Sequence, residues 1–144
     1  MSARLTLLFA VAATLGIGAI AVGVSQAAPA PGLDYEFFKT KVEPIFLKER
    51  PPHEPCYNCH EGANNFLHLE PLAEGQKFWT EEQSRKNFES ISRLVTPANK
   101  AESRLLIHPL APEAGGDLFH SGGRQFESKN DPDYKILMQW VGVQ

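Results

Sequence analysis

The 144-residue chain contains only two cysteines, Cys56 and Cys59, and His60 follows them directly. Two thiols three positions apart can react with one edge of a flat ligand, while the adjoining imidazole reaches the centre of that ligand. This C-x-x-C-H spacing is the attachment signature of c-type haem. The sequence therefore predicts one haem c, covalently attached through Cys56 and Cys59, with His60 as an iron ligand.

Two other uses of a C-x-x-C pair fit the sequence less well. A redox dithiol of the thioredoxin kind requires a strand–helix–strand context, and the chain shows no alternation of strand and helix patterns. A structural zinc site requires two further ligands at metal-site spacing. His68 and His108 are available, but they do not form such a pair.

The N-terminal segment has the features of an export signal. A positive start containing Arg4 precedes an apolar run over residues 5–24, and small residues before and at Ala27 suit a signal peptidase. The run of about 20 residues is also long enough to cross a bilayer. We expect residues 1–27 to be a signal peptide, with a retained inner-membrane anchor as the alternative. In both cases the domain lies outside the cytoplasm, in the periplasm.

The charge balance of the exported part excludes a nucleic-acid binder. The chain carries 14 basic and 17 acidic side chains, and removal of Arg4 with the signal leaves 13 basic ones, a net charge of −4. No basic stripe remains that would suggest nucleic acid. Four cations precede the haem motif and could face an acidic partner, although such a run is more often a solvated helix face. They are Lys39, Lys41, Lys48 and Arg50.

Residues 28–33 read as a Pro/Ala tether, and residues 34–144 contain enough apolar residues for one compact domain. Asp34 is a candidate N-cap for a first helix. Apolar side chains then recur at three- and four-residue steps, at Tyr35, Phe38, Val42 and Ile45. Pro44 lacks an amide donor and should bend or end this helix near Glu43. The prolines of 48–55 predict an extended loop to the first cysteine.

Helical patterns also follow the haem motif. Residues 66–69 form a short apolar piece that could line a haem pocket. Thr80 and Gln83 match a capping box, and the helix they begin should end before Pro97. A short helix is expected over 103–107, little regular structure over 110–131, and a final helix after Asp131 and Pro132. Its expected inner face is Tyr134, Leu137, Met138 and Val141, and no strand pattern competes.

This layout resembles the class I cytochrome c fold, and more specifically the small monohaem cytochrome c domains of the Planctomycetes and Acidobacteria type. The resemblance covers about residues 33–142. Besides C-x-x-C-H, it rests on VEPIF at 42–46, RLVTP at 93–97, SRLL at 103–106, HSGG at 120–123 and the helix at 134–140. It implies an all-α domain with long loops around one covalently bound haem.

Few residues could bind iron opposite His60. Met138 lies within a predicted helix, where methionine usually packs. His120 lies in a loop, and Gly122 and Gly123 would let the backbone approach a haem face. The resemblance implies the same role for the histidine before the glycine pair. We therefore predict His60 and His120 as the iron ligands, with His108, Met138 or an open iron position as alternatives.

Two protein ligands would leave no position on the iron for a substrate, so the sequence predicts an electron carrier rather than an enzyme. The expected function is single-electron transfer to and from redox proteins outside the cytoplasmic membrane. The alternatives are a redox subunit of a larger membrane complex and a haem enzyme or gas sensor. We also expect the domain to depend on haem as part of its core. The side chains expected to pack on the haem are Phe38, Phe66, Leu69, Leu94 and Trp140.

Overall fold

The computed structural model describes residues 32–143, so the predicted signal peptide or anchor and most of the tether lie outside the described residues. Within residues 32–143 the regular structure is helical and no strand forms, which confirms the all-α prediction. No helix of this part of the chain is long and apolar enough to cross a membrane.

The first helical stretch has three consecutive segments: α1 (Tyr35–Phe37), the π-helical η1 (Phe38–Val42) and α2 (Glu43–Leu47). The Asp34 side chain accepts a hydrogen bond from the Phe37 amide at 3.0 Å, which confirms the predicted N-cap. Pro44 does not end the helix. It lies in the first turn of α2, after the wider turn of η1, where its missing amide leaves no hydrogen bond unmade. Helical structure therefore continues to Leu47.

The loop after α2 is more tightly folded than the prolines suggested. Arg50 and His53 form a backbone bridge around Pro51 and Pro52, and the His53 amide donates to the Arg50 carbonyl at 2.8 Å. The prediction of an extended loop is therefore wrong at this turn. The chain then enters α3 (Cys56–His60), so the whole C-x-x-C-H motif lies on one short helix.

The remaining helices follow the predicted signals closely. The longest, α4 (Glu81–Ser92), begins with the capping box of Thr80 and Gln83. After η2 (Lys100–Glu102) come α5 (Arg104–Ile107), η3 (Pro112–Ala114) and the C-terminal α6 (Pro132–Val141). The Asp131 side chain accepts from the amides at the start of α6, as an N-cap does. The long segment between α5 and α6 has only the turn η3, as expected.

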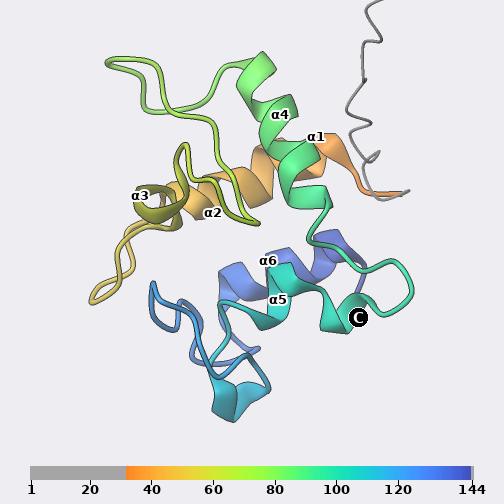
Figure 1. Ribbon diagram of the computed structural model, residues 1–144. Coiled ribbons are helices and arrows are strands. Elements are labelled where there is room, and N and C mark those ends of the chain that lie inside the picture. The colour runs from red at the N-terminus through yellow and green to blue at the C-terminus, as the bar shows by residue number, and fades with distance from the viewer. Residues whose placement is uncertain (1–31, 144) are drawn as a thin grey trace, which may run out of the picture.

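The helices form two groups that meet at the N- and C-terminal helices (Figure 1). α6 packs against η1 and α5, while α4 packs against η1 and α3 against α2. The rings of Phe38, Phe88 and Trp140 contact one another, and the Phe38 centroid lies 5.4 Å from that of Phe88 and 5.3 Å from that of Trp140. The Trp140 indole also donates to the Asp34 carbonyl at 2.8 Å, so it joins the two ends of the domain. Trp140 is thus a core residue, whereas Met138 is only half-buried.

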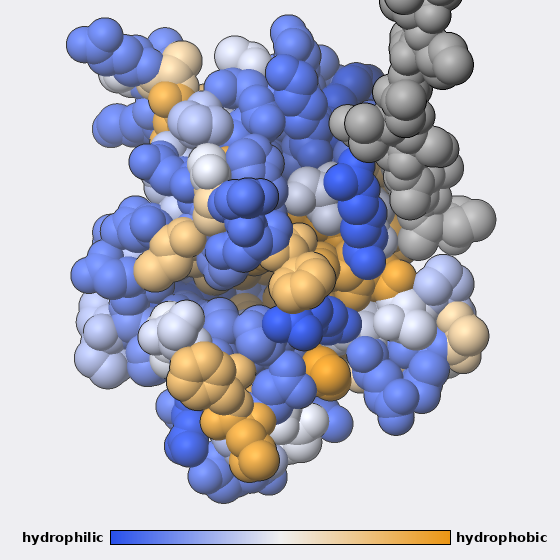
Figure 2. Space-filling view, in the orientation of Figure 1, coloured by the Kyte–Doolittle hydropathy of each residue, from blue (hydrophilic) through white to orange (hydrophobic). Residues whose placement is uncertain are grey.

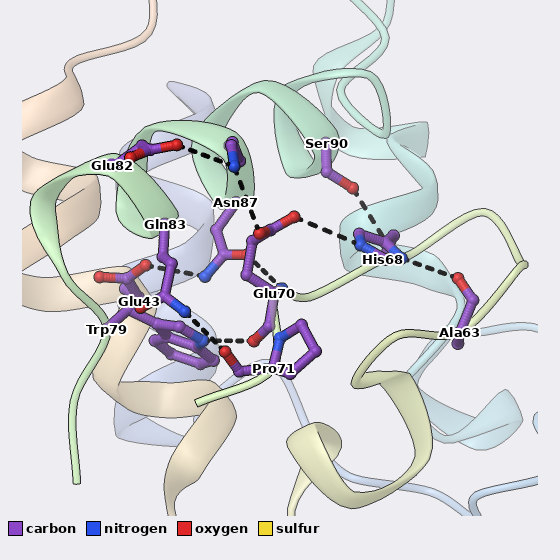
Figure 3. A network of polar contacts seen from close by, with 11 residues as sticks. Glu43, Ala63, His68, Glu70, Pro71, Trp79, Glu82, Gln83, Asn87 and Ser90 are labelled. Carbon is purple, nitrogen blue, oxygen red and sulfur yellow. Dashed lines mark hydrogen bonds and ion pairs between the residues drawn. The ribbon is translucent and has the colours of Figure 1, made fainter. Parts of the chain in front are cut away.

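A buried polar network fixes the segment before α4 (Figure 3). The buried Glu43 carboxylate accepts from the Ser84 hydroxyl at 2.7 Å and from the Asn87 amide at 3.1 Å. Asn87 in turn accepts from the Glu70 amide at 2.7 Å, and the Trp79 indole donates to the Glu70 carbonyl. The network holds the 61–80 segment against α4, and this segment supplies the backbone that contacts His60.

Candidate functional site

A cavity partly open to solvent lies between α3, α5 and the loop before α6. Cys56, Cys59 and His60 line it from one side, and His108 and His120 also contribute to its wall. Most of the remaining wall is apolar and includes Ile45, Phe46, Leu94, Leu105, Phe126 and Leu137. The cavity therefore brings the C-x-x-C-H motif together with the loop histidine, 60 residues later in the chain.

The His60 and His120 rings are nearly parallel, with an interplanar angle of 10° and a centroid distance of 6.4 Å. Two imidazoles that bind one metal atom from opposite sides, with bonds of about 2 Å, have centroids about 6 Å apart. The observed separation is close to this value, so the two rings are spaced for a single metal atom between them.

Both rings are oriented through Nδ1 by backbone carbonyls. His60 Nδ1 donates to the Leu67 carbonyl at 3.0 Å, and His120 Nδ1 donates to the Gly123 carbonyl. A carbonyl can only accept, so the proton of each neutral ring resides on Nδ1 and the lone pair resides on Nε2. Such hydrogen bonds fix the tautomer and raise the basicity of a metal-binding histidine. Both rings therefore have the form that a metal ligand needs.

The loop that carries His120 is closed at both ends. Leu110 and Phe126 form a backbone bridge, with the Phe126 amide donating to the Pro109 carbonyl at 3.1 Å. Gly123 has φ of +83°, and a Cβ atom there would lie 2.8 Å from His53 Nδ1. Only glycine suits this backbone conformation and close approach. Gly123 thus shapes the turn after His120 through its approach to His53, while the expected approach of the glycine pair to a haem face stays a prediction.

Burial lowers the pKa of His120, and the neighbouring His108, His60 and Arg104 lower it further, while the hydrogen bond to Gly123 opposes the change. A lowered pKa keeps the imidazole neutral near pH 7. The neutral ring is the form that binds a metal. The environment of His120 therefore favours a ligand role over a charged one.

The other candidate ligands are placed differently. His108 lies edge-on to His120, with centroids 4.7 Å apart, and its Nδ1 is 2.8 Å from Asp117 Oδ2. His108 and His120 therefore lie side by side on the cavity wall, and His108 is held by a carboxylate rather than by a backbone carbonyl. Met138 packs at the edge of the hydrophobic core and does not line the cavity. His68 is also outside the lining and is bound to the Ala63 carbonyl at 2.9 Å.

The two cysteines do not have the properties of a redox dithiol. Burial raises the pKa of the Cys56 thiol to about 11. A reactive dithiol of the C-x-x-C kind instead has a lowered thiol pKa. A zinc site is not supported either, since no cluster of three or more ligating side chains occurs within residues 32–143.

The residues present fit a c-type haem. Both cysteines edge the cavity, two oriented imidazoles face across it, and the wall is mainly apolar. The list of side chains predicted to pack on the haem needs correction, because only two of the five, Phe66 and Leu94, line the cavity. Phe38, Leu69 and Trp140 do not line it, since they pack in the protein core between helices.

Two charged residues of the cavity wall, Glu54 and Arg104, were not predicted from the sequence. Arg104 lines the cavity, and its guanidinium lies over the Phe66 ring, 4.7 Å from the centroid. The sequence contained a signal for Arg104, because it precedes His108 by four residues and residues four apart share one face of a helix. A cavity lined by His108 could therefore have been expected to include Arg104. The carbonyl of Leu67 carried no such signal, since any residue type can supply it.

The basic run before the haem motif is mostly neutralised within the chain. Lys39 pairs with Glu81, while Lys48 and Arg50 both pair with Asp133. Ion pairs of this kind join the first helical stretch to α4 and α6. They leave less positive charge for an acidic partner than the sequence alone suggested.

Exposed apolar side chains adjoin both histidine-bearing segments. Leu118 and Phe119 directly precede His120 and are 93% and 77% exposed, and Phe66, which precedes Leu67, is 75% exposed. Figure 2 shows apolar side chains gathered at the lower end of the molecule, where Figure 1 places the segment that follows α5. Exposed apolar side chains therefore adjoin the segments that carry the two histidines.

Comparison with known proteins identifies no relative: no protein-family model, no curated protein and no solved structure matches this chain.

Proposed function

We propose that this chain is a monohaem c-type cytochrome with a class I-like domain, which carries single electrons outside the cytoplasmic membrane. The observation that carries the proposal is the pair of facing, carbonyl-oriented imidazoles of His60 and His120 across a cavity edged by Cys56 and Cys59. In this proposal the two cysteines form the thioethers, and the two histidines bind the iron.

Haem held in this way would supply reversible one-electron exchange between Fe(III) and Fe(II). The chain's own residues serve that exchange by keeping the site fixed. The carbonyls of Leu67 and Gly123 orient the imidazoles, and the apolar wall limits access of water. The exposed apolar surface at Phe66, Leu118 and Phe119 suits brief contact with a redox protein, because exposed apolar patches mark interaction sites.

A haem enzyme or gas sensor is the rival function, and His108 is the observation that favours it. Its ring lines the cavity beside His120 and is held by Asp117. If His120 were not an iron ligand, His108 would be placed to exchange protons with a bound molecule. A role as a redox subunit of a membrane complex is a further candidate, which depends on residues 1–27 being retained as an anchor.

The first test is expression of the full chain in a bacterial host with a c-type cytochrome maturation system. Haem should stay with the protein through acid–acetone extraction, and the intact mass should equal the polypeptide after Ala27 plus one haem. The oxidised protein should give a low-spin EPR spectrum typical of two imidazole ligands. Haem that is extracted freely would overturn the proposal, and a high-spin ferrous form that binds CO readily would favour the enzyme or sensor.

A further inference from the structure

We propose that Arg104 binds a propionate carboxylate of the haem, so that the haem lies with its thioether edge at α3 and its propionate edge at α5. This inference rests on the proposed function and assigns a binding role to a residue outside the C-x-x-C-H motif and the iron ligands.

The two ends of the cavity differ in charge. At the α3 end, Glu54 lies two residues before Cys56 and contributes to the wall. The Gln125 side-chain amide donates through Nε2 to the carbonyls of Glu54 and Gly122. Its Oε1 atom is buried and has no hydrogen-bond partner within residues 32–143. A carboxylate placed at this end would meet acceptors and a like charge.

At the α5 end, Arg104 supplies a permanent positive charge. Its guanidinium stacks over Phe66, and no carboxylate within residues 32–143 forms an ion pair with it. The other basic group on this part of the wall, His108, is held by Asp117. Stacking on an aromatic face leaves the edge of a guanidinium available for a bidentate carboxylate contact.

Haem chemistry connects these two ends. The vinyl groups that become thioethers and the propionates lie on opposite edges of the macrocycle. Attachment to Cys56 and Cys59 at α3 therefore directs the propionates away from Glu54. Arg104 comes from α5 and Phe66 from the segment that orients His60, so their contact joins the two walls at the rim. A carboxylate at this rim would meet the exposed guanidinium without leaving water entirely.

The test uses the matured holoprotein and three variants. Arg104→Gln removes both the charge and the paired N–H donors of the guanidinium. Arg104→Lys keeps the charge alone, and Arg124→Gln is the matched control. Arg124 lies four residues after His120, pairs with Glu113 and does not line the cavity. We expect the resonance Raman propionate bending band to shift in Arg104→Gln, to shift less in Arg104→Lys and to stay in place in Arg124→Gln. The midpoint potential should fall more in Arg104→Gln than in Arg124→Gln, because a cation near the iron disfavours Fe(III).

A second measurement needs no variant. In the ferrous low-spin holoprotein, nuclear Overhauser effects should connect the propionate methylenes with side-chain protons of Arg104 or Phe66. Propionate signals that instead connect with Glu54 or Gln125, or a propionate band that is unchanged in Arg104→Gln, would overturn the inference and leave the proposed function intact. Equal shifts in Arg104→Gln and Arg124→Gln would also overturn it. A matured protein without covalent haem would overturn the proposed function itself.

Discussion

His60 and His120 both line the cavity, and each has its Nδ1 bound to a backbone carbonyl. Replacement of His120 by alanine should therefore remove one iron ligand without disturbing His60, and the haem should become high-spin and able to bind CO. His108→Ala is the matched control and should stay low-spin, because His108 lies beside His120 at 4.7 Å. Optical and EPR spectra of both variants distinguish the two ligand assignments. A low-spin His120→Ala and a high-spin His108→Ala would assign the ligand to His108.

The proposed ligation by His60 and His120 leaves no place for a methionine ligand, which has a consequence for the wild-type protein. A methionine on the iron raises the reduction potential of a cytochrome c, and a second imidazole does not. The midpoint potential should lie below that of a comparably buried His/Met cytochrome, as measured by redox titration. Met138→Leu should leave the potential and spectrum unchanged, because Met138 does not line the cavity. A large change in this variant would contradict the His60–His120 assignment.

Glu43 is the buried carboxyl of the polar network, and its titration should be visible in stability. Burial raises its pKa from the usual 4.5, although hydrogen bonds from Ser84 and Asn87 oppose the rise. Between 4.5 and the raised value, the folded state holds a proton that the unfolded chain has lost. The free energy of unfolding contributed by this group therefore falls as pH rises through that window.

Glu43→Gln should flatten that part of the pH profile, as measured by chemical denaturation of the holoprotein at several pH values. The glutamine can still accept from Asn87 and donate to the Ser84 hydroxyl, so the network survives. Glu36→Gln, at an exposed position on the preceding turn, should keep the wild-type profile. A Glu43→Gln profile with the wild-type slope would show that this carboxyl does not titrate in the window.

The residues that could be predicted from the sequence are those whose signal is local. Asp34, Thr80 and Asp131 were recognised as caps, because a cap depends on the residue and its next few neighbours. The C-x-x-C-H motif and the turn after His120 are local in the same sense. The Arg104–Phe66 contact joins residues 38 positions apart, and the Leu67 carbonyl carries no residue-specific mark. Neither could be inferred without the fold.

At the scale of elements, the turn after His120 depends on the left-handed conformation of Gly123. Gly123→Ala should destabilise the domain by about 1–2 kcal/mol for this conformation alone, with an added cost from the approach to His53. Gly75→Ala is a matched control, since Gly75 has φ of +73° and open space around it. Denaturant titration of both holoproteins should show the larger loss in Gly123→Ala. Equal losses would mean that the contact with His53 costs nothing.

The first helical stretch shows that a proline does not always end a helix. The sequence predicted a bend or an end near Glu43, because proline disrupts an ordinary helix interior. The structure instead places the π-helical η1 before Pro44, with the Glu43 amide donating to the Phe38 carbonyl five residues back. The burial of Phe38, Val42 and Ile45 against neighbouring helices holds this unusual turn in place. Such a compensation comes from tertiary packing, which local propensity does not contain.

At the scale of the whole molecule, we expect one segment of the fold to depend on haem more than the rest. Phe38, Ile91 and Trp140 belong to the part of the core that does not line the cavity, and Trp140 joins α6 to the start of the first helical stretch. These side chains are already buried by protein. The segment 108–126 is different, since η3 is its only regular element and its apolar residue Phe126 lines the cavity. Haem binding would therefore stabilise this segment more than the terminal helices.

An apo form with Cys56→Ser and Cys59→Ser should consequently keep α4, α6 and the first helical stretch but lose order in 108–126. Hydrogen exchange followed by mass spectrometry measures this directly, because local opening with a low free-energy cost exposes backbone amides. Peptides from α4 and α6 should retain protection in the apo form, while peptides covering His120 should exchange much faster than in the holoprotein. Equal protection of 108–126 in both forms would show that the loop needs no cofactor. Loss of protection throughout the chain would instead make haem a requirement for the whole fold.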